Sequence, residues 1–300
     1  MAATWDQQRE RSNPIMLRLI LWIARRLGRH IARALLFPIV AYFLLTGGGS
    51  KKSSRDFLRR VLDHEPRFAD FARHFHAFAS VMLDRMLILS GNKMKLDFRM
   101  TQPPEVATAM RSGTGCLLLL AHFGSFEVLR ARAANESDLR LRILMDMALN
   151  PMFSTLIRQL DPVFAKSVID ASQRGPALAL ALKEALAEGA LVGTMADRVR
   201  DDERAVSVEF LGDTARLPAG PWILANVLHV PVILAFSIYR GGNRYDVQFE
   251  MMADKVDLPR STREQALQEY AQRYADRLAH HARLAPYNWF NFYDYWRKAS

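Results

Sequence analysis

Residues 116–131 read CLLLLAHFGSFEVLRA, an apolar run that leads directly to a histidine and then a glutamate. A short apolar run bounded by glycine is typical of a buried strand. On one continuous helix, His122 and Glu127 would point about 140° apart, so they converge only if the chain turns between them. Gly124 frees the backbone for that turn, and Ser125 is predicted to cap the helix that follows.

The histidine and glutamate admit three interpretations. A carboxylate bonded to one imidazole nitrogen fixes the tautomer and leaves the other nitrogen to accept a proton, which describes a catalytic pair. Backbone N–H groups at the helix start are then expected to face a developing oxyanion. The alternatives are a structural pair at the corner, which is equally compatible with the spacing, and a metal ligand set, which is less so. No serine or cysteine with nucleophile-elbow spacing accompanies the pair, which favours direct attack by an acceptor hydroxyl.

Strand-like and helix-like segments alternate along the rest of the chain. Apolar strand-like runs are expected at residues 115–121, 141–146, 190–197, 230–239 and 244–252. Helices are expected at residues 125–134, 151–160, 174–188, 218–229 and 261–284. This alternation predicts an α/β fold with a mixed, mostly parallel sheet flanked by helices. The carboxyl ends of strands in such sheets bind ligands, and His122 follows one of them.

Length and composition are those of a folded protein of one large or two modest domains. The chain has 300 residues, of which half are hydrophobic. Its single cysteine, Cys116, lies in the leucine run and cannot form an internal disulfide or a structural zinc site. A reducing compartment fits this cysteine content.

Positive charge is concentrated at the N-terminus. The formal net charge is +10, and residues 1–60 hold twelve basic but only three acidic residues. Arg18, Arg25 and Arg29 share one helical face. The apolar run 34–46 is thirteen residues long, whereas a membrane-spanning helix needs roughly 20.

We interpret residues 1–50 as a basic amphipathic or hydrophobic helical segment that anchors the chain on an anionic membrane. Residues 51–300 are then the catalytic domain, and residues 47–50 mark the break between the two. A basic helix packed on the domain is the alternative. Nucleic-acid binding is disfavoured because the arginines are interleaved with Leu, Ile, Trp and Phe. After the break, Ser53 or Ser54 is expected to cap a helix, and an aromatic stripe at residues 68–86 is expected to pack in the core.

An ordered set of motifs between residues 115 and 239 resembles a known family. The motifs are AHFGSFE, NPMF, LVGTMADR, VEFLGDTARLPAGPWILA and VPVILAF. They resemble the late acyltransferases of lipid A biosynthesis (lauroyl/myristoyl type) within the lysophospholipid acyltransferase superfamily, whose mark is H-x4-D/E. The N-terminal opening and the LDR near residue 84 are more similar to a branch associated with aryl polyene lipid clusters. The resemblance implies a glycerolipid acyltransferase-like sheet.

The resemblance also implies roles for individual residues. His122 matches the general base and Glu127 its carboxylate partner. Substrate contacts are expected at Gly124, Ser125, Asn150, Arg158, Asp197, Arg198, Gly212 and Pro218. Gly212 belongs to an FxG element, and Pro218 is expected to begin the next helix. An internal ion pair is the alternative for Asp197 with Arg198, and a surface position is the alternative for Arg158.

The implied reaction moves a fatty acyl chain to a hydroxyl of a lipid acceptor of the lipopolysaccharide or aryl polyene type. The expected donor is acyl carrier protein or acyl-CoA, with no metal and no other cofactor. The expected location is the cytoplasmic face of a Gram-negative inner membrane. A lysophospholipid or ornithine-type acceptor, or a non-catalytic membrane module, are the alternatives. The aromatic ending APYNWFNFYDYW (residues 285–296) is expected either to pack on the sheet or to bind acceptor.

Overall fold

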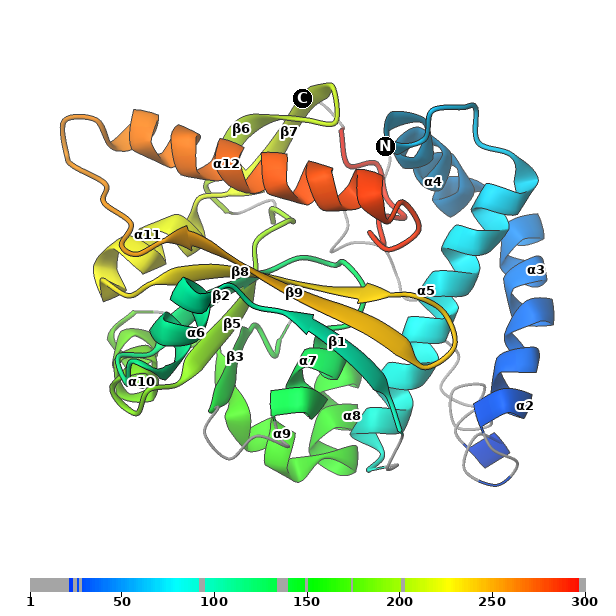
Figure 1. Cartoon of the computed structure of the whole chain (residues 1–300), viewed down its shortest axis with the longest axis horizontal. Coiled ribbons are helices and arrows are strands. Elements are labelled where there is room, and N and C mark those ends of the chain that lie inside the picture. The colour runs from blue at the N-terminus through cyan, green and yellow to red at the C-terminus, as the bar shows by residue number, and fades with distance from the viewer. Residues whose placement is uncertain are drawn as a thin grey trace.

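A single large sheet organises the chain (Figure 1). The structure, a computed structural model, describes residues 22–23, 26, 29–91, 95–133, 140–148, 151–173, 175–200 and 203–296. Across the seven-stranded sheet, the described strands lie in the order β1 (Asp97–Thr101), β9 (Arg244–Ala253), β8 (Val232–Tyr239), β2 (Cys116–Leu120), β5 (Leu191–Met195), β3 (Leu141–Met145) and β4 (Val168–Asp170).

The sheet is mixed and mostly parallel. Strands β2, β3, β4, β5 and β8 run in one direction, because each neighbouring pair among them is parallel. Strand β9 runs antiparallel to β8, and β1 is parallel to β9. The leucine run is strand β2, fully buried between β8 and β5. The prediction of a mixed, mostly parallel α/β sheet and the central place of this strand are confirmed.

Alternation along β2 gives each face of the sheet its own core. Leu117 and Leu119 pack with residues of α12 (Arg263–Leu284), α11 (Gly220–Leu228) and α10 (Pro176–Ala187). Leu118 and Leu120 pack on the opposite face with α6 (Pro104–Arg111). Figure 1 shows α12 lying across one face of the sheet and α6 and α7 on the other.

The described helices of the N-terminal part of the chain lie beside the sheet (Figure 1). They are α2 (Arg29–Ala34), α3 (Leu36–Thr46), α4 (Gly48–Val61) and α5 (Phe68–Leu89). Helix α3 packs against α5, and Phe71 and Phe75 of the aromatic stripe are buried in the main core. The division into an anchoring segment and a catalytic domain stays a prediction.

Of the predicted break at residues 47–50, only Gly47 separates two helices, and the predicted cap after it is wrong. The helical segments 31–46 and 48–61 meet there at 94°. Helix α4 begins at Gly48, so Ser53 and Ser54 lie inside it. Ser54 is buried, and its Oγ lies 2.9 Å from Nδ1 of His74. A polar side chain that sequence alone assigned to a helix end therefore joins α4 to α5.

Among the described residues, no single helix is long and apolar enough to cross a membrane. The two segments that meet at Gly47 pass the test of length and composition only when taken as a bent pair. Residues 1–21, which include Arg18, and also Arg25 lie outside the described residues.

Arg29 has a different role from the one predicted. It forms an ion pair with the fully buried carboxylate of Asp84 on α5, and Arg33 Nη2 lies 3.2 Å from the same group. Tyr245 donates a 2.7 Å hydrogen bond to Asp84 Oδ2. The guanidinium of Arg29 thus faces the protein interior, because a buried carboxylate needs a cationic partner.

Several elements were not anticipated from the sequence. They are strands β1 and β4, helices α6 and α9 (Pro162–Ser167), and a hairpin of β6 (Ala205–Phe210) with β7 (Asp213–Pro218). Pro218 is the last residue of β7, and α11 begins at Gly220. The prediction that Pro218 begins a helix is therefore wrong; Pro221 occupies the first turn instead.

Candidate active site

The corner after β2 depends on Gly124. Its φ is +63°, and a Cβ at this position would lie 1.5 Å from the backbone oxygen of Ser237. The nitrogen of Ser125 donates to that same oxygen at 3.1 Å. Only glycine fits both the dihedral angle and the close approach of β8. The predicted turn at Gly124 is confirmed, and helix α7 (Phe126–Ala133) starts two residues later.

Replacing Gly124 with alanine is expected to cost about 3 kcal/mol or more of folding free energy, from overpacking added to the unfavourable φ. Urea unfolding measures this loss. The matched control is Gly212→Ala, because Gly212 has φ +84° but no atom within 4 Å of an added Cβ. The control should lose only the part due to φ. Equal losses in the two variants would show that the contact with β8 is unimportant.

His122 is bonded to Asp197, which follows the neighbouring strand. Nδ1 of His122 lies 2.9 Å from Asp197 Oδ1, and the backbone nitrogen of His122 donates to Asp197 Oδ2 at 3.0 Å. Leu120 and Met195 are register partners in parallel strands β2 and β5. His122 and Asp197 each come two residues after that pair, so the parallel register brings them together.

Glu127 does not have the contact that was predicted for it. Its Oε1 forms a 2.6 Å ion pair with Nε of Arg85 on α5. The hydrogen-bond partner of the imidazole is Asp197, so the assignment of Glu127 as the group that orients His122 is corrected. The physical reason is that Glu127 lies in the first turn of α7, and this helix packs against α5.

The contact with Asp197 sets the tautomer of His122. A carboxylate only accepts hydrogen bonds, so Nδ1 carries the proton and Nε2 of the neutral ring is a base. Nε2 has no hydrogen-bond partner among the residues that the structure describes. The side chain of His122 is 33% exposed, whereas that of Asp197 is fully buried. The arrangement presents one basic nitrogen toward solvent.

Burial, together with two nearby arginines, keeps His122 neutral. Burial, together with the positive charges of Arg198 and Arg85, lowers the pKa of His122 and outweighs the opposing effect of Asp197. Burial on its own would raise the pKa of Asp197, but His122, Arg198 and the indole of Trp289 hold it well below its usual range. The pair therefore consists of a neutral imidazole and a carboxylate at neutral pH.

The aromatic C-terminal segment, residues 287–296, packs around this pair. Trp289 Nε1 donates to Asp197 Oδ2 at 3.0 Å, and Tyr295 donates to the backbone oxygen of Asp197 at 2.9 Å. Arg198 Nη2 donates to the oxygen of Phe290 at 2.8 Å. No site role was predicted for Trp289 or Tyr295 individually. The sequence signal for them was the unusual aromatic content of this segment, which packs on the sheet as one of the two predicted alternatives.

The polar groups of the corner are used differently from the prediction. The nitrogen of Gly124 donates to the oxygen of Asn288 at 2.8 Å, and that of Ser125 donates to Ser237. These two N–H groups are therefore engaged and do not face an oxyanion. The hydroxyls of Ser125 and Ser237 are buried without a hydrogen-bond partner in the described part of the chain, so Ser125 is not a helix cap.

Comparison with known families identifies the chain. It matches the family model described as bacterial lipid A biosynthesis acyltransferase over residues 15–298. The chain belongs to this family. No match was found among curated proteins. The matched range includes the His122 corner, Asp197 and the aromatic C-terminal segment, and the family indicates acyl transfer to a lipid acceptor.

The other predicted site residues of this acyltransferase do not all gather at His122. Arg198 does, since its charge acts on both His122 and Asp197. Arg158 is an exposed residue of α8 (Pro151–Leu160). Gly212 lies in the turn of the β6–β7 hairpin and lines a cavity of about 240 Å³ beside α12. Asn150 lies outside the described residues.

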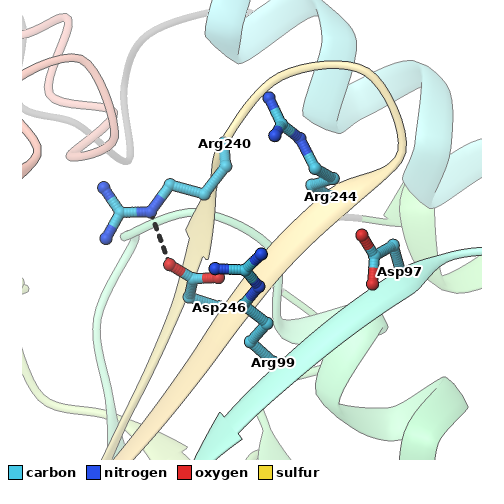
Figure 2. A pocket seen from close by; sticks show the side chains of 5 residues that line it. All are labelled: Asp97, Arg99, Arg240, Arg244 and Asp246. Atoms are coloured by element: carbon cyan, nitrogen blue, oxygen red, sulfur yellow. Dashed lines mark hydrogen bonds and ion pairs between the residues drawn. The ribbon is translucent and has the colours of Figure 1, made fainter.

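A second cavity lies at the β1–β9 edge of the acyltransferase. It has a volume of about 270 Å³, and Figure 2 shows the side chains that line it: Asp97, Arg99, Arg240, Arg244 and Asp246. Arg240 Nε pairs with Asp246 Oδ2 at 2.7 Å. None of these residues was a predicted site residue, and His122 does not line the cavity. In the described ranges, no group of three or more His, Cys, Asp or Glu is placed to hold a metal ion.

Proposed function

We propose that the chain transfers a fatty acyl group from a thioester, on acyl carrier protein or coenzyme A, to a hydroxyl of a membrane lipid. The observation that carries this proposal is the imidazole of His122, held by Asp197 with Nε2 open, in a member of the lipid A acyltransferase family. A base that accepts a hydroxyl proton is what direct attack on a thioester requires. The family favours an acceptor of the lipid A type. An aryl polyene lipid is the more specific acceptor proposed from the resemblance of the N-terminal opening and the LDR motif.

The proposed reaction has one nucleophilic attack and one collapse. Nε2 of His122 takes the proton of the acceptor hydroxyl while that oxygen forms a bond with the thioester carbonyl carbon. The tetrahedral intermediate then breaks its C–S bond, and the leaving thiolate takes the proton back from His122. Asp197 stabilises the imidazolium that exists between the two steps. The products are an ester on the acceptor and a free thiol, so atoms and charge balance.

Two further groups have supporting roles in this proposal. Glu127 forms an ion pair with Arg85, whose positive charge lowers the pKa of His122. The buried hydroxyl of Ser125 has no hydrogen-bond partner in the described part of the chain, and a polar group of bound substrate would satisfy it. Arg198 places a positive charge beside the base, where negative charge develops during attack. Glu127, Ser125 and Arg198 thus remain proposed site residues.

The proposed location is the cytoplasmic face of a bacterial inner membrane. On α2 and α3, large apolar side chains are exposed to solvent, among them Phe37 at 66% and Leu45 at 84%. Lys52 and Arg55 on the adjoining α4 are exposed as well. Apolar side chains next to basic ones fit the interface of an anionic bilayer.

Replacing both Phe37 and Leu45 with aspartate is expected to abolish binding to vesicles of anionic phospholipid, because both apolar contact and charge attraction are lost. Flotation of the full chain with such vesicles measures binding. Val163→Asp is the matched control, because Val163 is 79% exposed on α9, away from these helices. The control should float like the unmodified chain. If the double variant also floats fully, helix α3 is not the membrane contact.

The reaction itself is tested with purified full-length chain. Isotope-labelled lauroyl carrier protein or lauroyl-CoA is the donor, and vesicles carry one acceptor each: an underacylated lipid A precursor, an aryl polyene lipid, a lysophospholipid or an ornithine-type lipid. Mass spectrometry should find one acceptor that gains the labelled acyl group, and the His122→Ala variant controls for uncatalysed transfer. Hydrolysis of the thioester without acceptor would still indicate an enzyme. A chain that neither transfers nor hydrolyses would support the non-catalytic module instead.

A further inference from the structure

We propose that Trp289 is a positioning residue of the catalytic pair and that, through this one side chain, the aromatic C-terminal segment completes the active site. This proposal rests on the proposed function. Trp289 acts through Asp197 and has no role in bond making or breaking. Its indole N–H sets both the orientation of the Asp197 carboxylate and how strongly that carboxylate attracts the proton of His122.

The carboxylate of Asp197 is held by hydrogen bonds from two residues. It is fully buried and accepts three hydrogen bonds in the described part of the chain. Oδ1 faces Nδ1 of His122, while Oδ2 accepts from the backbone nitrogen of His122 and from Trp289 Nε1. The first two bonds both come from His122 itself. Trp289 is therefore the side-chain donor that fixes the carboxylate independently of the imidazole.

The indole of Trp289 is itself held in place by the rest of the protein. Trp289 is 1% exposed, and its ring lies 5.0 Å from that of Phe57 and 5.2 Å from that of Phe210, in edge-to-face contacts. Its backbone oxygen accepts from Nε2 of the buried His74 at 3.0 Å, and its backbone pairs with Phe123. An indole fixed on ring and backbone cannot turn its N–H away from Asp197.

The indole N–H of Trp289 affects the pKa of His122 in a direction that can be predicted. An indole N–H only donates, so it stabilises the ionised carboxylate. Without this donor, Asp197 becomes a better acceptor for Nδ1–H, and the protonated form of His122 gains stability. The pKa of His122 then rises, so a larger fraction of the ring is protonated and inactive at a given pH. The carboxylate also loses one of the contacts that hold its plane.

The test uses two matched tryptophans of the same segment. Trp289→Phe removes the N–H and keeps an aromatic ring. Trp296→Phe makes the same change in the same aromatic cluster, but Nε1 of Trp296 donates to the backbone oxygen of Phe210 at 3.1 Å. For Trp289→Phe, kcat should fall about 10- to 100-fold at unchanged KM, and the acid limb of the pH–rate profile should move to higher pH. In the Trp296→Phe control, both kcat and the position of the acid limb should be unchanged.

A readout that does not need activity separates this proposal from the proposed function. NMR titration of the His122 ring, assigned by comparison with His122→Gln, should show a raised pKa in Trp289→Phe and no change in Trp296→Phe. This holds even if the wild-type chain transfers no acyl group, in which case only the proposed function fails. If Trp289→Phe does not fold, benzothienylalanine at position 289 keeps the ring size and lacks the N–H. An unchanged His122 pKa in the folded variant would overturn the proposal.

Discussion

Replacing Asp197 with asparagine is expected to lower kcat for acyl transfer by about 10³-fold or more, with little change in the donor KM. An amide in this position no longer requires Nδ1 to carry the proton, so the imidazole can adopt the tautomer with Nε2 protonated, which is not a base. The variant also loses the negative charge that stabilises the imidazolium. Single-turnover transfer from labelled acyl carrier protein measures the chemical step directly.

The decisive comparison is with Glu127→Gln. This change leaves Arg85 without its carboxylate partner, but it does not touch the bond between His122 and Asp197. We expect a loss of about tenfold, since one nearby charge becomes uncompensated. His122→Ala should abolish transfer. Suppose that Glu127→Gln is as inactive as His122→Ala while Asp197→Asn keeps its activity. Glu127 is then the carboxylate partner of His122, as the sequence predicted, and the assignment of that role to Asp197 is wrong.

The direction in which the acid limb of the pH–rate profile moves is a further test of the roles of Asp197 and Trp289. Asp197 raises the pKa of His122, so its replacement by asparagine should lower that pKa and move the acid limb of the pH–rate profile to lower pH. Removal of the Trp289 N–H should move the limb the other way. Opposite shifts from two neighbours of the same imidazole are difficult to produce by general loss of structure.

The strand at residues 116–120 and the turn at Gly124 could be predicted from the sequence, but the hydrogen bond between His122 and Asp197 could not. The leucine run and Gly124 were readable because burial and backbone freedom leave local signatures. The bond between His122 and Asp197 depends on β5 lying beside β2, and strand order is not a local property. Trp289 is farther still from local inference, because it reaches Asp197 only after α12 has returned the chain to the sheet.

The N-terminal arginines make a contact that no local sequence pattern indicates. A helical wheel places Arg29 with Arg18 and Arg25 on one basic face. In the structure, Arg29 and Arg33 form ion pairs with Asp84, a buried acidic residue of α5. No spacing rule connects residues 55 positions apart. The evidence for a membrane surface therefore rests more on exposed apolar side chains of α3 than on the arginines of α2.

Asp84→Ala is expected to destabilise the chain by about 3–5 kcal/mol, because it leaves two poorly exposed guanidinium groups and the Tyr245 hydroxyl without a carboxylate. Urea unfolding gives the free energy. Glu65→Ala is the control: its ion pair with Arg59 is largely exposed and should contribute at most about 1 kcal/mol. Equal effects would show that the buried cluster does not hold α2.

The same cluster decides how membrane binding should be tested. Asp84 ties α2 to α5, and the next residue, Arg85, pairs with Glu127 beside the catalytic corner. Deleting residues 1–50 would remove both arginines that neutralise Asp84 and would disturb α5 as well as the proposed membrane contact. Combining Asp84→Leu with Arg29→Met and Arg33→Met should recover most of the stability, since an apolar replacement leaves no unpaired charge. A triple variant as unstable as Asp84→Ala would show that packing of α2, and not its charge pairing, carries the loss.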